Sequence, residues 1–472
     1  MRRRRLHQVF GDVPGFAGKA RSCSRVYGLV ANAARVLDIC IAHLEYMVRW
    51  PWRWIRSRGK PRIRSFDVFD TLIARRSIHH AAVFELVEAR SGIPGTAKAR
   101  LAAEAVLQGQ GPYTIDDIWE EATRRLGLPV ETSILLRDLE VATEYEEAIP
   151  VRRNLDMVRP GDYLISDMYL DQAVIRELLA RVGLDRQFRL LVSNDGKSRG
   201  WVWSAIQTEA HVLRHLGDNR WSDAVIPRSR GVNASRTRMH RATEAEGWLL
   251  TSGFPALGRL AREIRLATWS SDAVVRELQV IQANLNLPFL VVATAGLIHR
   301  MSLLGKSHAL FCARDCFAWK CVFDSVVNVL GLGLTSEYFW ASRVAFRTGG
   351  AAFMRYAEAS LTRQSIVVDL TGSGRGSLAY LVDRLGLNDV GAYFLSRTDN
   401  ESEPTWLPER LSIFSLIGSR SSAFAGKMAV FGSFDEFANQ ASHPSVRDVA
   451  EIDGRWVPVF VPECRSDRDL EL

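Results

Sequence analysis

The sequence is poor in cysteine and has no long apolar run. Its six cysteines are spread over 472 residues and form no Cys-x-x-Cys pair. Cys312, Cys316 and Cys321 cluster, and we interpret them as buried reduced thiols, because a metal site needs further soft ligands at tighter spacing. No run of about 18 consecutive apolar residues occurs, so no membrane-spanning helix is expected. The opening MRRRRL lacks the apolar core and cleavage site of a secretory signal.

An excess of positive over negative charge is lacking outside the first part of the chain. Residues 1–64 contain 15 Lys/Arg and 3 Asp/Glu, a balance of +12, so the rest of the chain carries −4 of the overall +8. The basic character of the chain is therefore a property of this segment. With 47% hydrophobic and 24% charged residues, the composition is that of an ordinary globular protein, and the length favours two or three domains.

The basic segment also carries a pattern typical of a membrane surface. Residues 26–48 can form an amphipathic helix, and Trp50, Trp52 and Trp54 then alternate with Pro51 and Arg53. Tryptophan beside arginine suits an interface with anionic lipid, so residues 1–60 are expected to contact such a surface. The alternative is a helix packed on the protein's own surface with a basic linker after it. No nucleic-acid motif accompanies the charge, so nucleic acid is not expected as a partner.

From Ile63 onward the pattern becomes α/β. Strand-like runs end in polar motifs, and helical periods follow them. Between the first two runs lies a stretch, about residues 74–158, that is expected to be wholly helical, with Thr114 as an N-cap. We therefore predict a basic extension (1–62), a parallel-sheet domain (63–240) with a helical cap, a second α/β domain of uncertain function (241–440), with its early part (240–275) helical, and a C-terminal tail (441–472).

Polar motifs follow four successive strands of the first predicted domain. Asp67 stands in SFDVFDTL, Ser166 in ISDMYL and Lys197 in SNDGKSRG. Asp218 and Asp223 stand in GDNRWSD. Carboxyl ends of parallel strands meet in one crevice, so these side chains are expected to converge. A carboxylate nucleophile, a hydroxyl, a lysine and further carboxylates that hold Mg²⁺ together suit phosphoryl transfer.

This ordered set resembles the four motifs of the haloacid dehalogenase superfamily, and the match covers about residues 63–240. The resemblance implies a Rossmann-like sheet with a helical cap. It implies Asp67 as nucleophile and metal ligand, and Ser166 and Lys197 as holders of the transferring group. Asp218, Asp223 and the backbone carbonyl of Phe69 would complete a Mg²⁺ site. Two further residues, Ser193 and Asn219, are helpers or, as we favour, turn residues.

Phe69 departs from that pattern. The phosphatases of the superfamily usually carry an aspartate two residues after the nucleophile, as general acid for the leaving group, whereas an aromatic residue there is typical of its dehalogenase branch. Asp70 lies one residue further on and points elsewhere in an extended strand end, so we assign it to the following turn. The dehalogenase branch works without Mg²⁺, yet Asp218 and Asp223 remain here as a metal-binding pair.

The second half contains VVDLTGSGRGS, a strand followed by a glycine-rich turn. Asp369, Thr371, Gly372, Gly374 and Gly376 of this motif, with Arg314 of FCARDCF, are candidate phosphate-binding residues, because backbone N–H groups of such a turn can cradle phosphate. The spacing is G-x-G-x-G and no P-loop lysine is present. A tight strand-to-helix turn with a buried Arg–Asp pair is the alternative interpretation.

The whole layout is similar to bacterial hydrolases of the same superfamily that have a long C-terminal extension and occur beside glycosyltransferases of surface-polysaccharide synthesis. The segments FCARDCF, YFWASR and VVDLTGSGRGS support this resemblance. It implies a cytoplasmic hydrolase, peripheral on the inner membrane face, that acts on a small phosphorylated metabolite with Mg²⁺. Two alternatives stay open. One is a catalytically weak partner in polysaccharide biosynthesis at the membrane surface, and the other is a nucleotide-sugar or phosphoribosyl transferase-like C-terminal domain.

Overall fold

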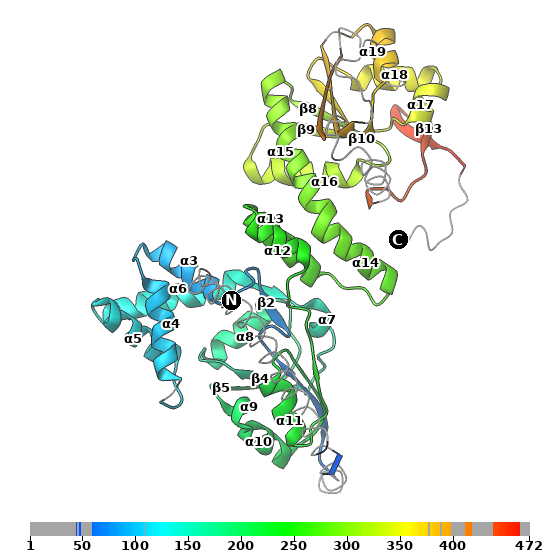
Figure 1. Ribbon diagram of the computed structural model, residues 1–472. Coiled ribbons are helices and arrows are strands. Elements are labelled where there is room, and N and C mark those ends of the chain that lie inside the picture. The colour runs from blue at the N-terminus through cyan, green and yellow to red at the C-terminus, as the bar shows by residue number, and fades with distance from the viewer. Residues whose placement is uncertain are drawn as a thin grey trace, which may run out of the picture. The chain divides into compact units, whose positions relative to one another are not determined.

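The computed structural model describes residues 44, 47–48, 59–108, 110–375, 378–387, 389–397, 411–417 and 438–462. The predicted amphipathic helix with its tryptophans lies outside this range, apart from single positions, as do Gly376 and the three remaining cysteines Cys23, Cys40 and Cys464. By its internal contacts the chain divides into two compact units (Figure 1). Unit 1 comprises the described residues up to Gly247 together with Arg262–Trp269, and unit 2 comprises Trp248–Ala261 and the residues from Ser270 onward.

Unit 1 is built on a five-stranded sheet of order β5-β4-β1-β6-β7, in which every neighbouring pair is parallel. Its strands are β1 (Arg62–Asp67), β4 (Tyr163–Asp167), β5 (Arg189–Ser193), β6 (His211–Gly217) and β7 (Ala234–Arg236). The first four are the predicted strands, whereas three-residue β7 is too short to show a period of its own. Because β1 occupies the centre, the polar residues that follow it have neighbouring strand ends on both sides.

Apolar side chains cover both faces of this sheet. On one face Phe66 of β1 packs with Leu164 of β4 and with Leu178 of α8 (Gln172–Arg181). On the other face Ile165 packs with Trp203 of α10 (Trp201–Glu209). Strands buried on both faces explain why the predicted runs read as nearly continuous apolar segments rather than alternating ones. The remaining short elements are α7 (Arg152–Leu155), α9 (Gly196–Arg199), η1 (Trp221–Val225) and α11 (Ile226–Ser229).

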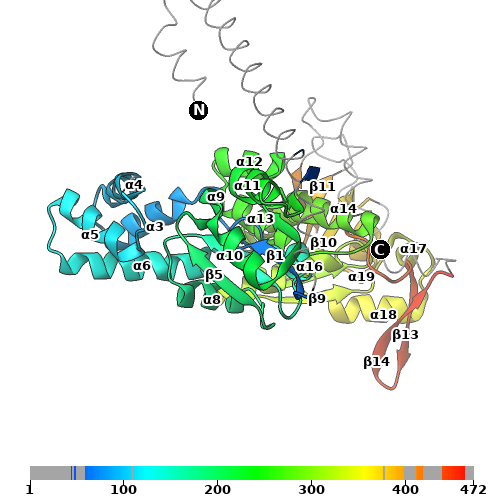
Figure 2. The same cartoon turned by 90° about the horizontal axis from the view of Figure 1, so that it is seen from below.

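Four helices between β1 and β4 form a separate block on one side of the sheet, as both views show (Figures 1 and 2). They are α3 (Ala81–Ser91), α4 (Thr96–Leu107), α5 (Ile115–Leu126) and α6 (Glu131–Glu147). Thr114 caps α5 as predicted, since its hydroxyl accepts from Asp117 N and the Asp117 carboxylate accepts from Thr114 N. The expectation of an entirely helical stretch was wrong at its ends, because β2 (Ile73–Arg75) and β3 (Ala148–Pro150) pair there as an antiparallel ladder.

Unit 2 contains a second parallel sheet, of order β12-β11-β10-β8-β9. Its strands are β8 (His308–Cys312), β9 (Thr335–Phe339), β10 (Ser365–Gly372), β11 (Val390–Arg397) and β12 (Leu411–Ile417). Alternate residues of β10 face opposite cores, with Val367 on one side and Ile366 and Val368 on the other. The prediction of an α/β protein with parallel sheets is confirmed.

The helices that follow β7 along the chain are α12 (Glu244–Thr251), α13 (Pro255–Ala267), α14 (Ala273–Ile281), η2 (Gln282–Asn286), α15 (Leu287–Leu304), α16 (Phe317–Leu330), α17 (Arg343–Thr348), α18 (Ala351–Ser360) and α19 (Leu378–Leu385). Helices α15 to α19 contribute buried side chains to the two cores of the second sheet. Helices α12 and α13 confirm the helical interpretation of 240–275. In the tail, left unassigned from sequence, β13 (Val446–Ile452) pairs with β14 (Arg455–Phe460), and β13 packs beside α17 and α18 (Figure 2).

One described helix, Ala273–Leu304, is long and apolar enough to cross a membrane by length and composition, although no such helix was expected. Leu290, Leu297 and Met301 of its second half are buried and pack against the sheet of unit 2. A core helix passes the same test of length and composition, so this single helix is weak evidence for a membrane span.

Candidate active site

The four motifs of unit 1 come together at the carboxyl edge of its sheet. Asp67 is the last residue of central β1, and its register partner on β4 is Ile165, so Ser166 lies one position beyond on the adjacent strand. Asp218 follows directly after β6 on the other side of β1. Asp67 and Ser166 are both buried. The predicted convergence of Asp67, Ser166 and Asp218 at one edge follows from the parallel pairing.

Lys197 lies between two of the predicted carboxylates. Its ammonium donates to Asp67 Oδ1 and to Asp223 Oδ1, the latter at 2.7 Å. All three side chains are buried. The lysine is placed by α9, whose backbone N–H groups are held by Asp167: Lys197 N and Ser198 N donate to its two oxygens at 2.9 and 3.0 Å.

His215, which no sequence motif indicated, holds Asp223 in place. Asp223 Oδ1 lies 3.2 Å from His215 Nε2, and the other ring nitrogen lies 2.9 Å from Ser65 Oγ. Asp223 Oδ2 accepts from Asn219 N at 2.9 Å. A side chain at Gly217 would place its Cβ 2.3 Å from Asp223 Cγ, so the glycine of GDN is required for this close approach.

The electrostatics of this cluster are those of excess negative charge around one cation. Burial acts to lower the pKa of Lys197, but the carboxylates of Asp67 and Asp223 outweigh it and raise that pKa above its ordinary value. Burial also acts to raise the pKa of Asp223, yet Lys197 and His215 hold it below its usual range. Burial lowers the pKa of His215, so its ring is neutral at neutral pH.

The other two carboxylates of the cluster, Asp67 and Asp218, are harder to ionise. Burial raises the pKa of Asp67 well above its ordinary value; Lys197 opposes this, and the charges of Asp223 and Asp218 add to it. Burial, with the charges of Asp70 and Asp223, raises the pKa of Asp218 to about 7. Full ionisation of this group would be stabilised by an additional positive charge.

The donor set suits a hard divalent cation. Carboxylate oxygens of Asp67, Asp218 and Asp223 all lie within 4.8 Å of one another. Hard divalent cations take oxygen ligands of this kind, and one lysine leaves two of the three negative charges unbalanced. The Phe69 backbone carbonyl stays a predicted fourth ligand.

The turn after β1 fixes the nucleophile candidate. Thr71 Oγ1 donates to Asp67 Oδ2 at 2.9 Å, and Leu72 N and Ile73 N both donate to Val68 O, which closes a single helical turn. Asp70 has φ of 56°, in the left-handed region, and its N donates to Ile73 O at 2.6 Å. Its backbone therefore belongs to the turn, as assigned, but the expectation that Asp70 points elsewhere was wrong, because its carboxylate lies beside Asp218 and His240.

Two of the helper candidates also serve turns. Ser193 Oγ donates to Asp167 Oδ1 at 2.7 Å and accepts from Gly196 N, while Asn219 Oδ1 accepts from Trp221 N at 2.8 Å. Both therefore order the loops that carry Lys197 and Asp223. The sequence motif ISDMYL contains Asp167, but no role was predicted for it. Its position directly after Ser166 is the feature of the sequence that indicates a place in the site.

A second group of ligand-type side chains lies beside the first. One oxygen of Asp70, one of Asp218 and one ring nitrogen of His240 lie within 4.8 Å of one another. Burial lowers the pKa of His240, and its Nδ1 is buried without a hydrogen-bond partner among the described residues. His240 stands in the loop after β7, where no motif pointed to it.

The helical block contacts the same edge through the loop after β4. Ile115 N donates to Tyr169 O at 3.1 Å, and Tyr169 Oη donates to Glu140 Oε1 at 2.8 Å. Asn194, in the loop before Lys197, donates through Nδ2 to Tyr113 O at 2.6 Å. The block is thus connected to the loops that carry Ser166 and Lys197.

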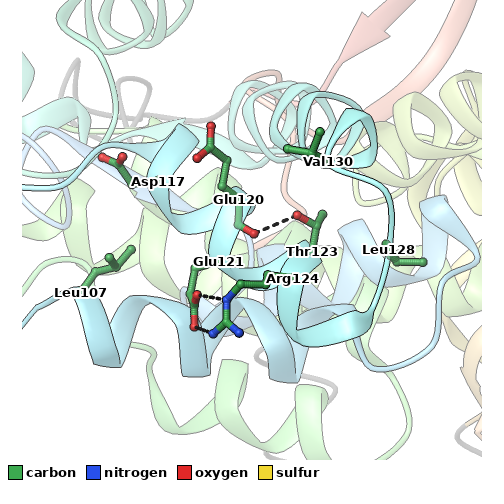
Figure 3. A pocket seen from close by; sticks show the side chains of 8 residues that line it. All are labelled: Leu107, Asp117, Glu120, Glu121, Thr123, Arg124, Leu128 and Val130. Atoms are coloured by element: carbon green, nitrogen blue, oxygen red, sulfur yellow. Dashed lines mark hydrogen bonds and ion pairs between the residues drawn. The ribbon is translucent and has the colours of Figure 1, made fainter.

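A pocket of about 520 Å³ lies within the helical block itself (Figure 3). Charged side chains of α5 line it, among them Glu121 and Arg124, which pair with each other at 2.7 Å, while Leu107, Leu128 and Val130 add apolar edges. It includes none of the predicted site residues.

In unit 2 the predicted residues meet only in part. Asp369 and Thr371 belong to β10, and Thr371 O accepts from Arg343 Nη2 at 3.1 Å. Gly372 is the last residue of that strand, and Gly374 follows with φ of 74°. Arg314 pairs with adjacent Asp315 at 2.9 Å, as the alternative interpretation predicted, but the pair is half-buried rather than buried. Of the clustered cysteines, Cys312 and Cys316 are buried free thiols, whereas Cys321 is exposed.

No family model matches the chain, and no curated protein matches it. The class of the protein is therefore defined by its own structure: two α/β units with parallel sheets, the first with a buried carboxylate–lysine cluster at its carboxyl edge.

Proposed function

We propose that unit 1 is a phosphohydrolase of the haloacid dehalogenase type that works with Mg²⁺ on a small phosphorylated metabolite. Its sheet order places the strand of Asp67 at the centre, and the helical block between β1 and β4 occupies the position of a cap. The single helical turn and the β2–β3 ladder after Asp67 fit the same arrangement. These features support the proposal together with the order of the four motifs.

The observation that carries the proposal is Lys197 between Asp67 and Asp223, with Asp218 beside them. A purely structural salt bridge needs one carboxylate per cation, and three buried or half-buried carboxylates around one ammonium are costly to stability. Such strongly perturbed groups at a crevice are characteristic of functional sites.

In the proposed reaction, an Asp67 oxygen attacks the phosphorus atom and displaces the leaving oxygen. The aspartyl-phosphate is then hydrolysed by water, which restores the carboxylate. Lys197 balances the charge shared by Asp67 and the transferring group, and the Ser166 hydroxyl is placed to hydrogen-bond a phosphoryl oxygen. Thr71 holds Asp67 Oδ2 and so orients the attacking group. Asp67, Asp218, Asp223 and the Phe69 carbonyl would hold Mg²⁺, which would supply positive charge to the phosphoryl oxygens.

A panel of phosphate esters and anhydrides, assayed with purified full-length protein and Mg²⁺, tests this proposal. The wild type is expected to turn over at least one compound, and Asp67→Asn to abolish that turnover. Asp162→Asn is the matched control, because Asp162 is equally buried but pairs with Arg64 away from the cluster. No turnover by the wild type, or turnover retained in Asp67→Asn, would refute the proposal.

Binding of a phosphorylated ligand at the carboxyl edge of the unit 2 sheet is a second candidate function. The Thr371 hydroxyl is buried and has no hydrogen-bond partner among the described residues, although buried hydroxyls are generally paired. Asp369 shares its face of β10, because residues two apart in a strand point the same way. Nucleotide sugars and phosphoribosyl pyrophosphate are the ligands to test.

Thermal shifts with these compounds distinguish the possibilities for unit 2. A ligand that raises the melting temperature of the wild type should have a smaller effect on Thr371→Val, which keeps the shape but removes the hydroxyl. Thr348→Val, at an exposed site of the same unit, is the control. A flat response of the wild type across the panel would count against binding.

A further inference from the structure

A basic loop of unit 1 lies against the candidate active site. It begins at Arg236, the last residue of β7, and comprises Arg236–Arg241, with the sequence RTRMHR. Thr237 N donates to Gly217 O at 2.8 Å, and Arg236 Nε donates to Asp218 O at 2.9 Å. The loop is therefore attached to the two residues at the end of β6, one of which is a predicted metal ligand.

The other side of this loop is held by buried arginines of α13. Arg262 Nη1 donates to His240 O at 2.5 Å. Arg265 donates to Met239 O at 3.1 Å and to Arg241 O at 3.0 Å, and it is itself paired with buried Glu246. Three successive carbonyls of the loop are thus fixed, so its position beside Asp218 does not depend on a ligand.

The loop concentrates positive charge around Arg236, whose Nε donates to the Asp218 carbonyl. Burial and the charges of Arg238 and Arg241 lower the pKa of Arg236, and Arg220 of the GDNRWSD motif adds to this effect. Arg238 and Arg241 are exposed, and in the described part of the chain no carboxylate pairs with either. Arginine clusters of this kind suit phosphate, which they bind with paired, charge-assisted hydrogen bonds.

Phe69 adds an independent constraint on the leaving group. It occupies the position two residues after Asp67, and its ring lies under the Arg75 guanidinium at 4.9 Å. A phenyl ring cannot protonate a departing alkoxide. A departing phosphate needs no such proton, because its second pKa is about 6. A leaving group that carries a phosphate at the scissile oxygen therefore needs no acid at the position of Phe69. Its negative charge also suits the neighbouring arginines.

We propose that the preferred substrate of this site is a phosphoanhydride, in which the transferred phosphoryl group is joined to a second phosphate that the Arg236–Arg241 loop binds. This inference rests on the proposed function. A bond forms between an Asp67 oxygen and the terminal phosphorus, and the P–O bond to the bridging oxygen breaks. The electron pair stays on that oxygen, whose charge the arginines stabilise. Water then cleaves the aspartyl-phosphate, and both of its hydrogens leave on orthophosphate.

The test compares three probes with the full-length protein and Mg²⁺: inorganic pyrophosphate, p-nitrophenyl phosphate and glucose 6-phosphate. Wild-type kcat/KM is expected to be highest for pyrophosphate and lowest for glucose 6-phosphate, whose alkoxide is a poor leaving group. In Arg238→Gln/Arg241→Gln the ratio of kcat/KM for pyrophosphate to that for p-nitrophenyl phosphate should fall at least about tenfold, since charge-assisted hydrogen bonds are lost. Arg124→Gln/Arg125→Gln removes the same charge from α5 and should leave the ratio unchanged.

The outcomes separate this inference from the function it rests on. If no probe is turned over, the phosphohydrolase proposal fails. If p-nitrophenyl phosphate is turned over but pyrophosphate is not preferred to glucose 6-phosphate, or if the ratio survives in the double variant, only the anhydride inference fails. Should the double variant not fold, calorimetry on Asp67→Asn answers instead. In that variant pyrophosphate must bind more tightly than orthophosphate, and an added Arg238→Gln must reduce this difference in affinity. If either result is not obtained, the inference is overturned.

Discussion

The Arg75 guanidinium lies 4.9 Å above the ring of Phe69, and it is held there by two hydrogen bonds to Glu144 at 2.7 and 2.8 Å. The pair connects the turn after the candidate nucleophile to β2 and, through Glu144, to α6 of the helical block. Phe69 is therefore fixed by packing at the position where an acid would be needed for alkyl esters.

Phe69→Asp is expected to add the missing general acid. Turnover of alkyl phosphates such as glucose 6-phosphate should rise about 100-fold, the lower end of the range that a positioned acid supplies. Turnover of p-nitrophenyl phosphate, whose leaving group needs little protonation, should change much less. Phe69→Asn is the matched control, since it has similar shape to the aspartate and no acidic proton. A similar gain in both variants would show that space, not proton donation, limits the reaction.

Lys197→Met should destabilise unit 1 by about 3–5 kcal/mol, because two buried carboxylates then lose their shared cation. Urea unfolding measures the change. Asp223→Asn alone also leaves a charge imbalance. The double variant Lys197→Met/Asp223→Asn should lose less stability than the sum of the losses in the two single variants, because the two side chains contact each other at 2.7 Å and their effects are coupled. Additive single effects would contradict the role of the lysine as the shared partner.

Mg²⁺ affinity should rise with pH up to about 7 and then level off. The pKa of Asp218 is raised to about 7 by burial and neighbouring charge, so below that pH a proton competes with the metal for this carboxylate. Calorimetric titration at pH 5.5, 6.5 and 7.5 should show a decrease of up to about tenfold per pH unit below 7. An affinity that is flat over this range would remove Asp218 from the metal site.

The same group should make the metal-free protein less stable as pH rises. The pKa of Asp218 in the folded protein lies above its ordinary value of 3.8, so the folded state binds the proton more tightly than the unfolded chain does between these values. Stability is therefore lost as pH rises from about 4 to about 7. In EDTA, Asp218→Asn should melt a few degrees above the wild type at pH 8 and near it at pH 4.5. A difference that does not depend on pH would contradict this linkage.

Glu140→Ala should destabilise the helical block by about 3–5 kcal/mol. Arg100 is fully buried and donates to both Glu140 oxygens, at 2.7 and 3.0 Å, so removal of the carboxylate leaves a buried guanidinium with only Glu104 as a charged partner. Glu177→Ala breaks an exposed pair with Arg181 and should cost less than about 0.5 kcal/mol. Chemical denaturation of both variants decides whether burial makes this difference.

Much of the fold was visible in the sequence because buried parallel strands are continuous apolar runs that end in polar residues. β1, β4, β5 and β6 were identified this way, as were β8, β10 and β11. The strands β2, β3 and β7 have three residues each, too few for a period. Strands β12 to β14 lie where the pattern gave no assignment, and they exist because of long-range pairing.

The site was predictable to the extent that its residues end strands. Asp67, Ser166 and Asp218 converge because parallel pairing brings the same ends together, and Lys197 and Asp223 follow in the next turns. His215 and Asp167 were missed, because their importance depends on hydrogen bonds across 8 and 30 residues of sequence. The role of the Arg236–Arg241 loop could not be predicted either, because its arginines indicate a binding site only once their position beside Asp218 is known.

The helical block enters and leaves the sheet domain through two strands that pair with each other. Ile73 faces Pro150 and Arg75 faces Ala148, so the two ends of a 72-residue excursion lie one ladder spacing apart, about 5 Å. A short turn could join Arg75 to Ala148 without disturbing β1 or its nucleophile. The block is in this sense an exchangeable module, because it can be replaced between Arg75 and Ala148 while the strand that carries Asp67 keeps its pairing.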